Sequence, residues 1–268
     1  MFVVTMREGK APKDLPVVIF SKGRFLAEVW VKSSARPSLL GEITTTIGRH
    51  NILIKNIMAY TAGNVGNAFI LIDCTNMTCR AEDLIRDLRS IDGVTDVAFF
   101  APSHYGYVYE VFGFPLTTSN KEEVMIMRTK SFTRMLDGIR AYFGSAGDAF
   151  LWYLAREGGA NTAEWFIEEL EGLGVVDRIK FHLDTLFSVG WGRFELAKFD
   201  EESRVIEIVV KDCLEVLHSK GAYSEPRCIF IRGYLTGALS KYLNRDIRLE
   251  EVKCEGKGDP YCLFIGHF

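Results

Sequence analysis

The chain has 268 residues, of which 48% are hydrophobic and 25% are charged, and its formal net charge at pH 7 is −3. This ordinary globular composition excludes a disordered or collagen-like chain, and the length favours two domains. The longest apolar runs, such as residues 97–102, are far shorter than the roughly 18 residues that span a bilayer. The first residues also lack the apolar core of a signal peptide. We therefore expect a cytoplasmic protein with no membrane span, and the near-neutral charge gives no sign of direct nucleic-acid binding.

After an extended lead-in, the first hundred residues alternate between strand-like and helix-like patterns. The turn-forming sequence at 61–66 joins two strands into a hairpin, and Gly48 and Gly93 mark the ends of the two helical segments. We predict strands and helices in the order βαββαβ at residues 25–32, 37–48, 51–59, 67–74, 81–91 and 94–100. This order is that of the ferredoxin-like split motif.

A second interpretation of residues 38–58 is a DNA-binding helix-turn-helix, with Gly48 in the turn. Its recognition helix would then fall on residues 52–57, which are rich in β-branched isoleucine. Such residues favour strands over helices, so the sequence favours the ferredoxin-like interpretation.

Residues 24–100 resemble the ACT family of small regulatory domains. The resemblance is carried by the sequences at 36–43, 51–54 and 88–97. It implies a domain that forms dimers or binds an amino-acid effector. Ala35 and Ser38 stand where the family has aspartate and glycine. Two alternatives therefore stay open, namely amino-acid binding at this turn and a domain that only pairs its edge strands with a second copy.

The second half begins after an aromatic, glycine-rich stretch that reads as a packed connector. Helical periodicity covers residues 121–158 with a break at 144–147, and Asn161 with Glu164 resembles a capping box that starts another helix. A helix at 178–189 and a hairpin around Asp200 follow. Helices followed by strands predict an α+β domain. The expected divisions are an N-terminal extension at 1–23, an ACT-like domain at 24–101, a connector at 102–120 and a second domain at 121–268.

Six cysteines in a chain without a secretion signal favour metal or redox chemistry over a disulfide framework. Gly256, Gly258 and Pro260 predict a tight turn that brings Cys254 and Cys262 together. With Cys228 and Glu251, these two cysteines would supply three thiolates and one carboxylate. Such a set fills a tetrahedral zinc site with no open position, which is the structural type.

The same residues give the chain a resemblance to the 4-vinyl reductase (V4R) domain, over roughly residues 115–268. The motif reads Cys228-x4-Gly233-Tyr234-x2-Gly237, and then Glu251-x2-Cys254-x-Gly256-x-Gly258-Asp259-x2-Cys262. The V4R domain is a small-molecule-binding module of bacterial phenol and xylene sensors, in which cysteine, glutamate and two further cysteines hold zinc. The resemblance therefore implies structural Zn²⁺ at Cys228, Glu251, Cys254 and Cys262. It also implies a fold shared with transport-particle subunits that enclose a lipid-sized cavity.

Other interpretations of these cysteines remain open. Cys254 and Cys262 could form a disulfide, and the four residues could pack or face solvent without a metal. Cys74, Cys79 and Cys213 have no comparable partners in the sequence, so we interpret them as core or surface thiols.

No catalytic motif or dinucleotide loop is visible, which favours a binding role over an enzymatic one. His182 lies in an aromatic helix, where it could orient a phenol-like ligand in an apolar pocket. The residues that we expect to bind the ligand are His182, Phe181, Trp191, Trp165 and Tyr234. We predict a ligand-sensing regulatory protein that forms a homodimer and binds a small hydrophobic or aromatic molecule. The alternative is a reductase-associated or carrier protein in tetrapyrrole or aromatic metabolism.

Overall fold

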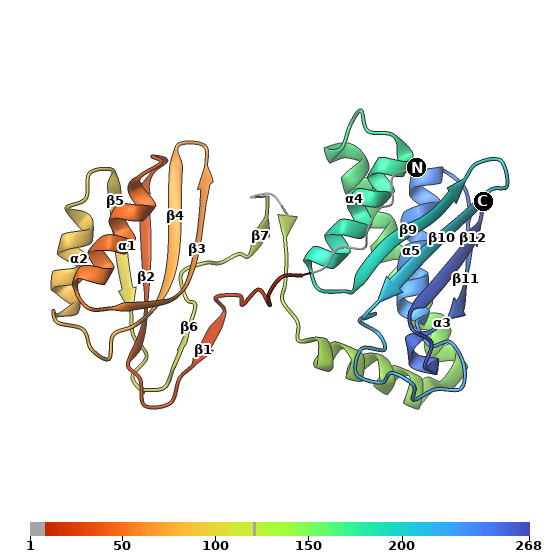
Figure 1. The fold of residues 1–268 in the computed structure, drawn as a ribbon, viewed down its shortest axis with the longest axis horizontal. Helices are drawn as coiled ribbons and strands as arrows, with labels where there is room; N and C mark the ends of the chain where they lie inside the picture. Colours follow the sequence, from red (N-terminus) through yellow and green to blue (C-terminus); the bar gives the residue numbers. More distant parts are fainter. Residues whose placement is uncertain (1–8, 120–121) are drawn as a thin grey trace. The chain divides into compact units, whose positions relative to one another are not determined.

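The computed structural model describes residues 9–119 and 122–268 (Figure 1). The chain divides into two compact units, residues 11–126 and residues 127–268, and each is described by itself. Both units combine helices with an antiparallel sheet, so the predicted α+β class is confirmed. Among the described helices, none has the length and apolar character needed to cross a membrane.

The N-terminal unit has the predicted βαββαβ order. Its elements are β2 (Leu26–Ser34), α1 (Leu39–Arg49), β3 (Leu53–Ala62), β4 (Val65–Asp73), α2 (Ala81–Arg89) and β5 (Val94–Phe100). The four strands form one antiparallel sheet in the order β3-β4-β2-β5. Residues 53–62 form a strand where a helix-turn-helix would need its recognition helix, so the DNA-binding interpretation is wrong.

Helices α1 and α2 lie side by side over one face of this sheet (Figure 1). Apolar residues recur at helical spacing, and Ile43 and Ile47 of α1 are buried together with Leu84 and Leu88 of α2. They pack against alternate strand residues such as Val29, because successive side chains of a strand point to opposite faces.

A two-stranded ribbon adds to the N-terminal unit. Strand β1 (Val18–Phe20) pairs with β6 (Tyr107–Tyr109), and Val108 of β6 is buried with Leu26 and Leu71. The short strands β7 (Thr117–Thr118) and β8 (Glu122–Glu123) form a further hairpin. Part of the expected extension and the expected connector therefore belong to the first compact unit.

Glu28 is a buried acid on β2, and its side chain has no exposed surface. The backbone N–H of Val111 donates to Glu28 Oε2 at 2.9 Å, while Oε1 makes no hydrogen bond to any described residue. Burial raises the pKa of Glu28 to about 7, and the nearby carboxylate of Glu110 adds to this effect. The segment that contains Glu110 and Val111 therefore lies over a carboxyl group that holds its proton up to near-neutral pH.

We expect this burial to make the stability of the N-terminal unit fall with rising pH. The folded pKa of Glu28 is about 7 against 4.5 ordinarily, so the folded state binds more protons between these values. The free energy of unfolding should therefore decrease as pH rises from about 4.5 to 7, by up to about 3 kcal/mol. Urea unfolding of the full chain between pH 5 and 8 measures this slope, which Glu28→Gln should remove. Parallel pH profiles for the two proteins would contradict the assignment.

The C-terminal unit consists of three helices and a four-stranded sheet. Its elements are α3 (Thr129–Glu169), α4 (Val175–Ser188), β9 (Arg193–Asp200), β10 (Val205–Lys211), α5 (Ile229–Leu243), β11 (Arg248–Lys253) and β12 (Cys262–His267). The sheet is antiparallel, in the order β11-β12-β10-β9. The expected hairpin around Asp200 is present, as β9 and β10.

The predicted new helix at Asn161 is wrong, because α3 continues through this position to Glu169. The kink in α3 lies instead at Gly144, whose φ of 55° is left-handed, as the predicted break at 144–147 indicated. Gly159 of α3 has a packing role. A Cβ atom on Gly159 would lie 2.0 Å from the carbonyl oxygen of Tyr234 in α5, so the two helices approach closely there.

Candidate metal centre

Four side chains from separate parts of the C-terminal unit converge on one buried point. Cys228 immediately precedes α5, Glu251 lies on β11, Cys254 follows β11, and Cys262 begins β12. Their candidate ligand atoms all lie within 4.8 Å of one another. We call these four residues the metal cluster. The structure thus brings together the set chosen from the sequence, and its occupancy by a metal stays a prediction.

The spacing of the sulfur atoms suits a tetrahedral metal. Cys228 Sγ lies 3.8 Å from Cys254 Sγ and 3.7 Å from Cys262 Sγ. Zinc–sulfur bonds of about 2.3 Å in a regular tetrahedron place the sulfur atoms about 3.8 Å apart. All three thiols are fully buried, so they would hold the ion away from water.

Glu251 has a free oxygen for the fourth ligand position. The backbone N–H of Cys228 donates to Glu251 Oε2 at 2.8 Å, while the buried Oε1 makes no hydrogen bond to the described part of the chain. Burial, together with the adjacent Cys254, raises the pKa of Glu251 to about 8. A buried carboxylate oxygen without a partner costs free energy, which a bound cation would offset. The residues present therefore fit Zn²⁺.

The turn between β11 and β12 places two of the thiols. A short 3-10 helix, η1 (Glu255–Lys257), is followed by Gly258 at a left-handed φ of 96°. Asp259 Oδ2 accepts a hydrogen bond from the Cys254 N–H at 2.9 Å, and the Glu255 N–H points to Cys262 Sγ at 3.3 Å. The turn thus brings both cysteines close together, as the glycine and proline pattern predicted.

Cys213 also lies beside the metal cluster, although no partner for it is visible in the sequence. It is fully buried just after β10, and its Sγ lies 3.5 Å from Cys228 Sγ. Cys74 is also buried and Cys79 is half-buried, both in the N-terminal unit. All six cysteines are free thiols in the structure, so the alternative disulfide between Cys254 and Cys262 is not formed.

The residues expected to bind a ligand lie in one connected set of rings, the aromatic cluster. It comprises Phe132, Trp165, Phe166, Phe181, His182, Trp191, Phe230, Tyr234 and Tyr242. Phe166 contacts Trp165, Phe181 and His182 at centroid distances of 4.8, 5.2 and 5.0 Å. The ring of Trp191 lies tilted against the ring of Tyr234, with their centroids 4.9 Å apart. The structure therefore brings all five predicted residues into one region, although Phe181 is partly exposed.

His182 lies at the centre of the aromatic cluster with both ring nitrogens occupied. Its Nδ1 is 2.9 Å from the Tyr242 hydroxyl, and its Nε2 is 3.0 Å from the Tyr234 hydroxyl. In the neutral ring one nitrogen donates and the other accepts, so one hydroxyl accepts and the other donates. Tyr242 was not among the expected residues, because nothing in its local sequence distinguishes it from a core tyrosine.

Burial lowers the pKa of His182 to about 4, which predicts a loss of stability in acid. The unfolded chain binds a proton at His182 below about 6.5, whereas the folded chain does not until about pH 4. The contribution of His182 to the free energy of unfolding is about 3 kcal/mol at most. It is fully present above pH 6.5 and is lost as the pH falls to about 4. Urea unfolding at pH 7 and pH 4.5 tests this prediction. His182→Gln, which does not titrate, should lose less stability than the wild type, and an equal loss would contradict it.

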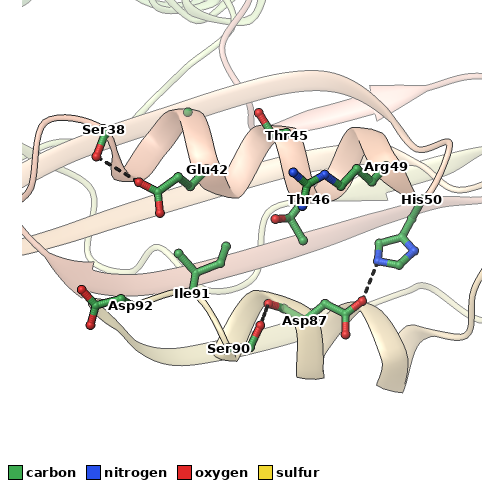
Figure 2. Close-up of a pocket in the computed structure, with 11 residues that line it drawn as sticks. Ser38, Glu42, Thr45, Thr46, Arg49, His50, Asp87, Ser90, Ile91 and Asp92 are labelled. Carbon is green, nitrogen blue, oxygen red and sulfur yellow. Dashed lines mark hydrogen bonds and ion pairs between the residues drawn. The ribbon is translucent and has the colours of Figure 1, made fainter.

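A separate polar groove of about 770 Å³ lies between α1 and α2 of the N-terminal unit (Figure 2). His50 Nε2 lies 3.0 Å from Asp87 Oδ2 and connects the two helices at one end. Near the other end, the Ser38 hydroxyl donates to Glu42 Oε1 at 2.9 Å. No pattern in the sequence predicts this groove, because most of its residues are ordinary solvent-facing helix positions.

The turn considered for amino-acid binding lines a second recess, bounded by residues 33–43 and by the hairpin of β3 and β4. Arg36 donates from Nη1 to the Ser38 hydroxyl at 2.7 Å and to Glu42 Oε1 at 2.8 Å. The serine at the usual glycine position is therefore part of a hydrogen-bond network that fixes the turn.

Part of the C-terminal unit is similar to known proteins. Residues 206–268, which contain the whole metal cluster, match the family model of the V4R domain. The uncharacterized protein MJ0150 of Methanocaldococcus jannaschii is 35% identical over 74 residues, covering 28% of this chain and 41% of that protein. The uncharacterized protein MJ0855 of the same organism is 37% identical over 67 residues, covering 24% and 28%. The chain thus spans less than half the length of these relatives.

Three solved structures are similar to parts of the chain. The phenol-responsive sensory domain of the transcription activator PoxR, with phenol, is 17% identical with a TM-score of 0.48, covering 55% of this chain and 77% of that one. A vinyl-4-reductase family protein from Methanocaldococcus jannaschii is 21% identical with a TM-score of 0.33, covering 53% and 98%. The ACT domain of a GTP pyrophosphokinase from Chlorobium tepidum is 21% identical with a TM-score of 0.26, covering 29% and 99%.

Proposed function

We propose that the protein is a ligand-sensing regulator whose C-terminal unit binds a small hydrophobic or aromatic molecule in a zinc-stabilised V4R domain. The observation that carries the proposal is the metal cluster, because its four ligand atoms converge inside the segment that matches the V4R model. The alignment to that family is therefore supported by geometry that the sequence match does not itself contain.

The zinc would have a structural role. Three thiolates and one carboxylate fill a tetrahedral shell, so no coordination position remains for a substrate or an activated water. The ion would join the start of α5 to the hairpin of β11 and β12. Its loss should therefore loosen the packing of the domain and weaken ligand binding indirectly.

The aromatic cluster is the proposed binding region. Apolar rings surround His182, and pockets for small molecules commonly combine apolar walls with a few polar groups that fix orientation. Because Tyr234 and Tyr242 already bond both nitrogens of His182, a ligand hydroxyl would have to replace one of these tyrosines. An apolar ligand would need only space among the rings.

The N-terminal unit is proposed to supply dimerisation or effector binding. Its outer strands, β3 and β5, are the edges of the four-stranded sheet, and such edges can pair with a second copy. Sedimentation equilibrium of the full chain should give a homodimer. An amino acid at the turn around Ser38 would shift that equilibrium or raise the melting temperature.

Calorimetric titration with phenol and toluene tests ligand binding in the full chain. The wild type should bind both. Tyr234→Phe frees Nε2 of His182, and a phenol hydroxyl can then replace the lost partner. A hydrogen bond between phenol and His182 that contributes about 1 kcal/mol should make phenol bind about fivefold more tightly. The affinity for toluene, which has no hydroxyl, should not change. The exposed Tyr153→Phe is the matched control and should behave as wild type.

Two results would count against this account. If neither compound nor a fatty acid with a long apolar chain binds the zinc-loaded protein, the ligand-sensing proposal is wrong. If Tyr234→Phe changes phenol and toluene binding equally, His182 does not orient the ligand.

A further inference from the structure

We propose that Cys213 is a positioning residue of the metal centre, whose thiol donates a hydrogen bond to the Cys228 thiolate and thereby strengthens zinc binding. This inference rests on the proposed zinc site. It gives a role at the metal centre to a residue that belongs neither to the V4R motif nor to the metal cluster. The contact that supports it is the 3.5 Å distance between Cys213 Sγ and Cys228 Sγ.

The charge of the site explains why such a donor is needed. Three thiolates and one carboxylate carry four negative charges, and Zn²⁺ neutralises only two of them. The cysteines are fully buried, and water cannot solvate this excess charge. Hydrogen-bond donors around the ligands must therefore stabilise it, as outer hydrogen bonds do at other metal sites.

The donors that the structure provides are few and specific. Cys262 Sγ accepts from the Glu255 N–H at 3.3 Å. The Cys213 thiol lies 3.5 Å from Cys228 Sγ, and Cys213 is not one of the four candidate ligands. Cys228 also lies within 3.8 Å of both other cysteines of the metal cluster, so a donor to this sulfur acts at the centre of the negative charge.

Cys213 is held in place by residues of its own. Its backbone N–H donates to Glu255 Oε2 at 2.9 Å, and Glu255 Oε1 in turn pairs with Lys220 at 2.8 Å. Glu255 is 4% exposed, although it carries a charge. The same residue therefore contacts Cys213 through its carboxylate and Cys262 through its N–H, which connects the two groups that donate to the sulfur atoms of Cys228 and Cys262.

The test compares zinc affinity and cobalt spectra of the full chain under reducing conditions. Competition with a chromophoric chelator gives the zinc dissociation constant, and thiolate-to-Co²⁺ charge-transfer absorbance reports how many thiolates bind the metal. Cys213→Ala should weaken zinc binding about tenfold and keep the wild-type cobalt spectrum. Cys213→Ser keeps a donor and should recover most of the affinity. Cys254→Ser should lose charge-transfer absorbance, and the buried Cys74→Ala should match the wild type.

Each failure has a separate meaning. If the wild type binds neither zinc nor cobalt, the metal centre itself is wrong. If the wild type binds zinc and Cys213→Ala binds it equally well, only the role of Cys213 is overturned. If Cys213→Ala lowers the charge-transfer absorbance as Cys254→Ser does, Cys213 is a ligand and the positioning role is wrong. A circular dichroism spectrum of the zinc-loaded Cys213→Ser variant confirms that the comparison uses folded protein.

Discussion

Cys262→Ser is expected to abolish stoichiometric zinc binding and to unfold most of the C-terminal unit at 37 °C. Cys262 begins β12, whose neighbours in the sheet are β10 and β11, so a bound zinc ion would hold the centre of the sheet to the start of α5. Structural zinc sites contribute on the order of 10 kcal/mol to folding, which is comparable to the whole stability of a typical domain.

Thermal unfolding and metal analysis of the same samples measure this effect. We expect about one zinc per chain in the wild type and a large fall in the melting temperature of the C-terminal unit in the variant. The chelated wild type should resemble the variant. Cys79→Ser, in the N-terminal unit, is the control and should retain both zinc and stability. A metal-free Cys262→Ser protein that melts like the wild type would show that the cluster has no structural metal.

Gly237→Ala adds a single methyl group, and we expect it to lower the stability of the C-terminal unit strongly. A Cβ atom on Gly237 of α5 would lie 1.9 Å from the carbonyl oxygen of Arg156 in α3 and 3.0 Å from the backbone nitrogen of Ala160. Backbone atoms cannot rotate away as a side chain can, so α3 and α5 must separate. Overpacking of this kind costs about 3 kcal/mol or more.

Gly158→Ala provides the matched control for this prediction. Gly158 also lies in a long helix, yet a Cβ atom there would meet nothing within 4 Å. Alanine is the better helix former by about 1 kcal/mol, so this variant should be as stable as the wild type or slightly more stable. Denaturant unfolding compares the two variants. Equal stabilities would contradict the close approach of α3 and α5.

The metal cluster could be predicted from sequence because much of its geometry is local. Cys254 and Cys262 flank a turn whose glycine and proline residues are visible in the chain, and Glu251 lies three residues before Cys254. The contact of Cys213 with Cys228 could not be predicted in this way. It joins the end of β10 to the start of α5, and no local pattern shows where the chain between them returns.

The same distinction applies to the helices. The hydrophobic periodicity of α1 and α2 gave their positions within a few residues. The continuity of α3 across Gly158 and Gly159 was missed, because glycine usually marks a helix end. Gly159 is instead small in order to admit the backbone of α5, which is a tertiary requirement that only the folded structure reveals. The hydrogen bonds of His182 with two tyrosines similarly join helices α4 and α5, which are distant in sequence.

Native mass spectrometry of the full chain, purified from its own host without added metal, tests the central claim most directly. A zinc-stabilised ligand-binding domain predicts folded charge states that carry one zinc ion per chain, together with a hydrophobic molecule that is released at higher collision energy. Folded charge states at the mass of the bare polypeptide, with neither zinc nor a bound molecule, would contradict the account.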